Sequence, residues 1–153
     1  MTHKQNIVWI AVILSSLIGV FYLFNTAYAN PLSLPDYAFT KPDIREAYEF
    51  AKTDYQDLVG LPCSCGCGTP EGATAHGSRV HERGLADCFM NGNINEGGIW
   101  DSHASECGLC YQDALYAKSL YTEGNSKQEV KEKLEEMQAK RTFSNKAVYK
   151  NDE

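Results

Sequence analysis

The sequence PCSCGCG, from Pro62 to Gly68, places three cysteines at alternate positions. An extended chain advances about 3.3 Å per residue and alternates sides, so these thiols would project to one side, each about 6–7 Å from the next. The glycines between and after them permit bends that bring Cys63, Cys65 and Cys67 closer together. Such a row suits a soft metal ion or three separate disulfide partners, and it suits ordinary core packing poorly.

The N-terminal segment, residues 1–29, is predicted to be a signal peptide or a membrane anchor. It holds an uncharged apolar run over residues 7–24, followed by the small-x-small sequence AYA at 27–29. A cleaved signal peptide normally has an apolar core of about 7–15 residues. A membrane-spanning helix needs about 17–25 residues, so both interpretations remain open. Lys4 precedes the run and predicts that the rest of the chain lies outside the cytoplasm, either membrane-anchored or secreted.

The rest of the chain is predicted to be one domain between two less regular segments. Three prolines indicate an extended tether over residues 30–42. Residues 43–141 are expected to form a Cys/His-rich helical domain, and residues 142–153 a polar tail. The predicted fold class is all-α, a small bundle of about four helices with a Cys-rich loop, preceded by the N-terminal apolar helix.

Four segments show helical signals, and these are residues 40–60, 78–90, 102–123 and 126–140. An apolar stripe predicts the buried face of the first helix and consists of Ile44, Ala47, Tyr48, Ala51, Tyr55 and Leu58. Thr40 and Ser102 are expected to cap the first and third helices. Ser126 and Glu129 have the spacing of a capping box at the start of the fourth helix.

The cysteines and histidines are concentrated in one part of the chain. All six cysteines and three of the four histidines lie between positions 63 and 110. In a helix over 102–123, His103, Cys107 and Cys110 stand at i, i+4 and i+7 and share one face. In a helix over 78–90, His81 and Cys88 are also seven residues apart. The Cys-rich loop is expected to pack between these helices, which gives the candidate ligands Cys63, Cys65, Cys67, Cys88, His103, Cys107 and Cys110, with His81 in reserve.

The mixture of donors points to a metal site. Thiolate and imidazole ligands together are typical of transition-metal sites. Zinc takes four of them in a tetrahedron, and Cu(I) accepts a small number of soft thiolates, sometimes in a cluster of several ions. Copper or zinc is therefore the predicted cofactor. An iron–sulfur cluster also needs four ligands, but the alternate-position loop does not match the usual ferredoxin spacing.

Two other interpretations of the same cysteines stay open. Thiols outside the cytoplasm oxidise readily, so three disulfides could join the loop cysteines to Cys88, Cys107 and Cys110 in a non-catalytic interaction domain. The chain could also be an electron-transfer subunit with a copper or iron–sulfur centre. No serine–histidine–acid arrangement or phosphate-binding loop is recognisable, so no enzymatic activity is predicted. A net charge of −6 without a basic patch argues against nucleic acid as a partner.

Three sequence blocks resemble the PCYCGC-motif proteins, which are small exported or membrane-attached prokaryotic proteins of unestablished function. The blocks are LPCSCGCG at 61–68, LADCF at 85–89 and SHASECGLCYQDA at 102–114. Ser64 stands where the motif usually has tyrosine, and either His76 or His81 matches the histidine that precedes the second block. The resemblance covers about residues 61–117 and implies that the six cysteines and His103 form one constellation, without implying a reaction.

Together these observations favour an extracytoplasmic, membrane-attached metal-binding module. It would hold copper or zinc by cysteine and histidine, for metal carriage or for support of a membrane redox complex. The expected partners are the membrane, through the N-terminal segment, and a membrane protein complex.

Overall fold

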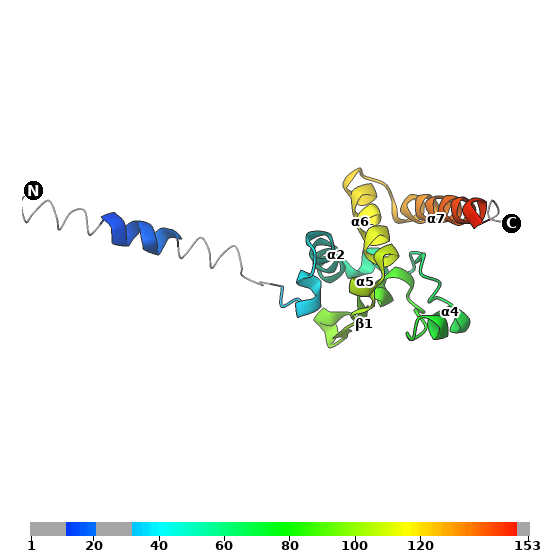
Figure 1. The fold of residues 1–153 in the computed structure, drawn as a ribbon, viewed down its shortest axis with the longest axis horizontal. Coiled ribbons are helices and arrows are strands. Elements are labelled where there is room, and N and C mark those ends of the chain that lie inside the picture. The colour runs from blue at the N-terminus through cyan, green and yellow to red at the C-terminus, as the bar shows by residue number, and fades with distance from the viewer. Residues whose placement is uncertain (1–11, 21–31, 150–153) are drawn as a thin grey trace, which may run out of the picture. The chain divides into compact units, whose positions relative to one another are not determined.

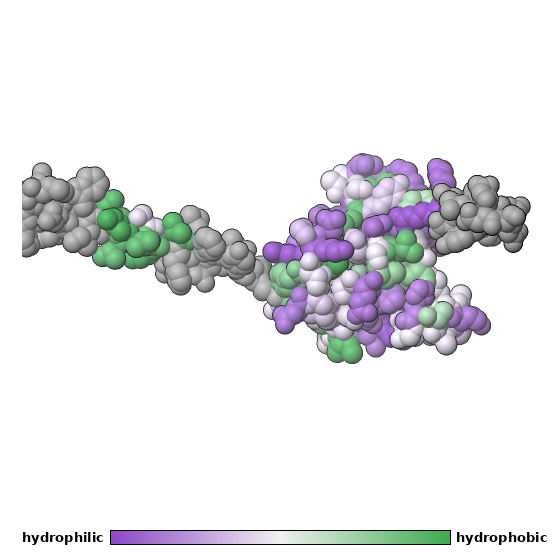
Figure 2. All heavy atoms as spheres, viewed as in Figure 1, coloured by the Kyte–Doolittle hydropathy of each residue, from purple (hydrophilic) through white to green (hydrophobic). Residues whose placement is uncertain are grey.

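The computed structural model describes residues 12–20 and 32–149, the last eight of these by their backbone alone. The chain divides into two units, Met1–Ser33 and Leu34–Glu153, and each is described by itself. In the first unit, residues 12–20 form a helix whose apolar side chains are exposed (Figure 2). Most of the predicted signal peptide or anchor lies outside the described residues. Among the residues that are described, no helix is both long and apolar enough to cross a membrane.

The second unit begins with a short 3-10 helix, η1 (Asp36–Phe39), followed by the helix α2 (Pro42–Thr53). Leu34 and Ala38 are buried, so part of the segment that the sequence predicted to be an extended tether packs into the domain. The prediction that Thr40 caps α2 is wrong, because its hydroxyl donates a hydrogen bond to the carbonyl of Tyr37 instead. Pro42 at the first helical position is preorganised for the helix start.

The core of the domain lies between α2, α3 (Tyr55–Leu58) and α6 (Gly108–Thr122). All six residues of the predicted apolar stripe are buried, which confirms that face. Tyr48, at its centre, is in edge contact with the rings of Phe89 and Trp100, at centroid distances of 5.0 and 5.8 Å. Figure 1 shows α2 beside α6, with the short helix α5 next to one end of α6.

The prediction of one continuous helix over 102–123 is wrong, because two helices form there. These are α5 (His103–Glu106) and α6, and Cys107 lies between them with an extended backbone, φ −102° and ψ 106°. The Ser102 side chain makes no capping hydrogen bond within the described residues; its hydroxyl donates to Glu106. A helix in which His103, Cys107 and Cys110 share one face therefore does not exist.

The last helix, α7 (Lys127–Tyr149), begins where the sequence predicts. Its capping box is confirmed, because the backbone N–H and hydroxyl of Ser126 donate to the Glu129 carboxylate at 2.7 and 2.6 Å. The α7 backbone continues to Tyr149, through most of the segment expected to be a polar tail. Val130 and Leu134 are buried, and α7 packs against α6.

The prediction of a helix over residues 78–90 is also wrong. Instead this region contains the 3-10 helix η2 (Gly84–Cys88) and the strand β1 (Met90–Asn91). Gly84 has a φ of +67°, and a Cβ there would overlap the carbonyl oxygen of Leu61. An α-helix cannot pass through a residue with that backbone conformation. The chain therefore turns at Gly84, and the N–H of the next residue, Leu85, donates to the carbonyl of Leu61.

A small hairpin follows, which the all-α prediction missed. Strand β1 pairs antiparallel with β2 (Ile99–Trp100), with Met90 opposite Trp100, and the 3-10 helix η3 (Ile94–Glu96) lies between them. A further short helix, α4 (Pro70–Ala75), follows the cysteine loop. The described domain is therefore mostly helical with one two-stranded sheet.

Candidate metal centre

The cysteine loop connects α3 to α4 and is held at both ends by backbone hydrogen bonds. At the start of the loop, the carbonyl of Leu61 accepts a hydrogen bond from the N–H of Leu85 at 2.9 Å. At its end, the carbonyl of Cys67 accepts one from the N–H of His81 at 2.8 Å. Gly66 turns the loop with a φ of +81°. Its carbonyl oxygen lies so close to Gly72 of α4 that a Cβ at that position would overlap it. The loop is therefore a defined turn that aims its thiols inward.

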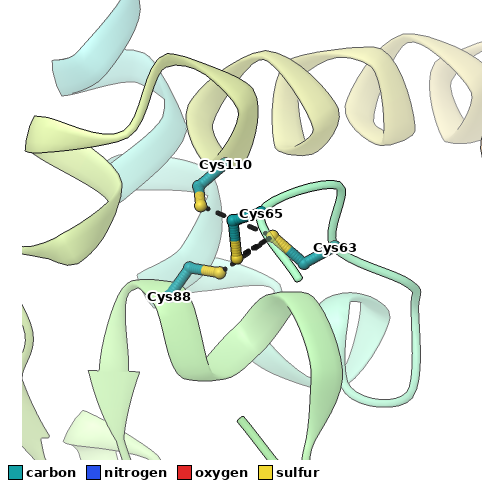
Figure 3. Close-up of side chains that lie close together, drawn as sticks. All are labelled: Cys63, Cys65, Cys88 and Cys110. Atoms are coloured by element: carbon teal, nitrogen blue, oxygen red, sulfur yellow. Dashed lines mark hydrogen bonds between the residues drawn. The ribbon is translucent and has the colours of Figure 1, made fainter. Parts of the chain in front are cut away.

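Four sulfurs converge from three segments of the chain. Cys63 and Cys65 come from the loop, Cys88 from η2 and Cys110 from the first turn of α6 (Figure 3). The sulfur of Cys63 lies 3.2, 3.1 and 3.4 Å from those of Cys65, Cys88 and Cys110, and all four lie within 4.8 Å of one another. Cys63 is half-buried and the other three are buried.

A second group of donors shares one member with the first. Cys65, Cys67, His81 and His103 also have their ligand atoms within 4.8 Å of one another. The Cys67 sulfur lies 3.6 Å from Nε2 of His103, and the His81 and His103 rings are in edge contact at a centroid distance of 5.0 Å. His81, Cys65 and Cys67 are buried, and His103 is half-buried.

A third group contains His103, Cys107 and Cys110. The structure thus brings together all eight candidate ligands, although not by the helical spacing that the sequence suggested. Cys88 and His81 meet at 3.3 Å between Sγ and Nδ1, because the chain turns at Gly84 and not because a helix joins them. His76 is exposed, its ring 6.1 Å from that of His103, and it belongs to none of the three groups found among the described residues.

The model of one protein family, described as proteins of unknown function with a PCYCGC motif, matches residues 26–146. The chain belongs to this family. No curated protein and no solved structure matches it. In this PCYCGC-motif protein the motif corresponds to PCSCGC at 62–67, and its three cysteines are the ones that the loop supplies to the first two groups.

The cysteine thiols of the first two groups differ in the direction in which their pKa values are shifted. Hydrogen bonds from Cys110 and Cys63 lower the pKa of Cys65 well below its usual range. Burial raises the pKa of Cys67 to about 12 and also raises that of Cys88. Its hydrogen bond with Cys63 raises the pKa of Cys110. Hydrogen bonding among these thiols therefore favours a negative charge within the group, and a metal ion that binds further thiolates must displace their protons.

A buried carboxylate positions the loop and was missed in the sequence. Asp113, three residues after Cys110 in α6, accepts hydrogen bonds from the backbone N–H and the hydroxyl of Ser64, at 3.0 and 2.6 Å. Gln138 and Arg141 of α7 donate to the same carboxylate, at 3.1 and 2.7 Å. The signal that could have revealed it is an acidic residue directly before the core residue Ala114, where an apolar side chain is expected.

Two arginines stabilise the segment that carries His81 and Cys88. Arg79 donates to the carbonyls of Asp87 and Met90, at 2.8 and 3.0 Å, and pairs with Asp101 at 3.3 Å. Arg83 pairs with the buried carboxylate of Asp87 at 2.7 Å. Because this segment has little regular structure, these contacts take the place of helical hydrogen bonds in fixing its two ligands.

The donor set fits a thiophilic metal ion. Four sulfurs bound at about 2.3 Å to one tetrahedral zinc ion lie about 3.8 Å apart. The four sulfurs of the first group lie within 4.8 Å of one another, and that of Cys63 lies 3.1–3.4 Å from the other three. Thiolate and imidazole are the ligands that zinc and Cu(I) prefer. The Cys/His cluster could therefore hold such an ion with modest movement of its side chains.

Proposed function

We propose that this domain is a metal-binding module that holds copper or zinc in its Cys/His cluster and carries the metal outside the cytoplasm. The convergence of Cys63, Cys65, Cys88 and Cys110 is the observation on which the proposal rests. Three of these sulfurs are buried, so the bound ion would be shielded from water and competing ligands. A closed tetrahedron of thiolates is typical of tightly held zinc.

The same contacts favour ligands over disulfide staples. All six cysteines lie in the described part of the chain and are free thiols there. A disulfide joins sulfurs in pairs, whereas Cys63 contacts three other sulfurs at once. The two imidazoles of His81 and His103 point into the same cluster, which staples would not require. Oxidation would also compete with metal binding, so the thiols need the metal or a reductant to remain reduced.

Carriage of the metal is favoured by the uneven exposure of the cluster. Cys63, His103 and Cys107 are half-buried, whereas Cys88 and Cys110 are buried. A partner could exchange ligands with the ion at the half-buried residues without unfolding the domain. The apolar N-terminal run and Lys4 support delivery at the outer face of a membrane, to a membrane protein complex or in support of a redox complex there.

Anaerobic purification tests the proposal directly. Elemental analysis should find copper or zinc bound stoichiometrically, and the thiols should become fully reactive only after chelation or unfolding. Cys88→Ser should lower the affinity for the metal strongly, because it removes a buried ligand, and His76→Ala is the matched control that should leave it unchanged. Native protein with three intact disulfides and no bound metal, measured by mass spectrometry without reductant under nitrogen, would overturn the proposal.

A further inference from the structure

Cys65 occupies a particular place in the cluster, because it belongs to both four-donor groups. It lies with Cys63, Cys88 and Cys110 in the all-sulfur group, and with Cys67, His81 and His103 in the mixed group. In each group the ligand atoms are within 4.8 Å of one another. A thiolate sulfur has more than one lone pair and can bind two soft metal ions at once, as in multinuclear thiolate clusters.

We propose that the centre holds two divalent ions of the zinc type, bridged by the thiolate of Cys65. This inference rests on the proposed function and extends it from a single site to a pair. The first ion lies in the all-sulfur group, and the second lies in the mixed group. Each ion then has four ligands, which is the number that closed zinc sites require.

The mixed group explains why two histidines lie beside a cysteine cluster. A single ion in the all-sulfur group would leave Cys67, His81 and His103 as three further donors close to Cys65. His81 is 2% exposed, and its Nδ1 and Nε2 contact the sulfur of Cys88 and the hydroxyl of Ser78, at 3.3 and 3.2 Å. A small movement of its ring turns one nitrogen to the second ion, and Ser78 or Cys88 remains as the partner that orients the ring.

Charge favours two divalent ions over one. One divalent ion among four thiolates leaves two uncompensated negative charges in a buried site, and buried charge that is not compensated is costly. A second divalent ion with the thiolate of Cys67 and two neutral imidazoles reduces this to one negative charge. Two Cu(I) ions with the same five thiolates would leave three. The donor set is therefore better balanced for a divalent pair.

The third group does not provide a third position of the same kind. Cys107 is the single donor that it adds, because His103 and Cys110 already belong to the other two groups. Cys107 is half-buried and has an extended backbone at the break between α5 and α6. Because Cys107 belongs to neither four-donor group, it does not complete either of the two positions.

Cadmium is the probe for this arrangement, because ¹¹³Cd²⁺ replaces zinc and is visible by NMR. Reduced full-length protein, titrated anaerobically, should bind two equivalents and give two resonances. The all-sulfur position should resonate downfield of the mixed position, because each thiolate deshields cadmium more than an imidazole does. Scalar coupling between the two resonances should be present, since it is transmitted through a shared sulfur.

Two variants and one control assign the positions. His103→Ala and Cys67→Ser each remove one ligand from the mixed group and leave the all-sulfur group complete. Both should bind one equivalent less and retain a single, unsplit downfield resonance. His76→Ala removes a nearby exposed histidine and should keep both resonances. Circular dichroism of each variant confirms that the helices remain.

The outcomes separate this inference from the proposed function. Wild-type protein that binds a single equivalent, or two without coupling between their resonances, overturns the bridged pair and leaves a metal-binding module. Protein that binds Cu(I) and no Cd²⁺ overturns the divalent pair in the same way. Reduced protein that binds neither metal overturns both proposals.

Discussion

Arg141 of α7 donates a hydrogen bond to Asp113 of α6, with 2.7 Å between Nη1 and Oδ1. The Asp113 side chain is fully buried, and its other carboxylate oxygen accepts hydrogen bonds from Ser64, between the first two cysteines of the motif. One carboxylate therefore joins the C-terminal helix, α6 and the cysteine loop. The helix α7 supplies no ligand among the described residues, yet it helps to position two of them through this contact.

Asp113→Ala should destabilise the domain and weaken metal binding together. Removing one partner of a buried ion pair costs about 3–5 kcal/mol. The Arg141 side chain is 34% exposed and can regain water, so we expect about 2–3 kcal/mol here. Asp113→Asn keeps an acceptor for Ser64 and should cost less. Urea denaturation and a zinc competition titration measure the two effects, and unchanged zinc affinity in Asp113→Ala would show that the carboxylate does not position the loop.

Gly84→Ala should be among the most damaging single substitutions. The new Cβ would overlap the carbonyl oxygen of Leu61, and the φ of +67° is unfavourable for alanine. Strained backbone alone costs about 1–3 kcal/mol, and the overlap adds to it. Gly97→Ala is the matched control, because Gly97 has a φ of +91° and open space around it. Thermal unfolding should show a clearly larger loss for Gly84→Ala, and equal losses would contradict the importance of the Leu61 contact.

Tyr48→Phe should lower stability without changing the metal content. The buried hydroxyl of Tyr48 donates to the carbonyl of Asp101 at 2.6 Å, next to α5. Loss of this bond should cost about 1 kcal/mol. Tyr121→Phe, which removes a more exposed hydrogen bond to the carbonyl of Asp57, should cost less. Chemical denaturation of the two variants, with elemental analysis, tests the ranking, and a reversed order would count against it.

The capping box of α7 should make stability depend on pH. Hydrogen bonds from the hydroxyl and N–H of Ser126 lower the pKa of Glu129 below its ordinary 4.5. Since the folded pKa is the lower one, the contribution is present above the unfolded pKa and is lost as pH falls through the folded pKa. Wild-type protein should melt slightly above Glu129→Gln at pH 7 and together with it below the folded pKa. Thermal melts of the two proteins over a series of pH values measure this difference, and a difference that does not change with pH would contradict it.

The parts of the fold that depend on local periodicity were predictable from the sequence. The buried stripe of α2 and α3 and the capping box of α7 follow from side-chain spacing within one helix, and the structure has both. The turn at Gly84 was not predictable in this way, because it is accompanied by a contact with a distant segment, and the periodicity of residues 102–123 gave no sign of the break at Cys107. Gly84 turns where it does because its backbone meets Leu61, more than twenty positions earlier in the chain.

For the candidate site, too, the residues could be predicted from the sequence, but their arrangement could not. Composition and clustering were sufficient to select the eight side chains that the structure brings together in the three groups. Their grouping was not available from spacing, since His81 and Cys88 meet across a turn and Cys107 lies outside any helix. Asp113 stands at an apolar position of α6, but its partners Ser64 and Arg141 are recognisable only in three dimensions, so its role could not be predicted from the sequence.

The donors of the centre lie far apart along the chain, and this has a consequence for the unfolded protein. An ion that stays bound to Cys65, Cys88 and Cys110 in a loosened chain closes two loops of about twenty residues each, and closing such loops removes configurational freedom from the disordered ensemble. The ion is then a removable cross-link that acts as a disulfide does, without a redox step. The domain's resistance to heat and proteolysis would therefore increase with the concentration of available metal, and a chelator alone would lower both.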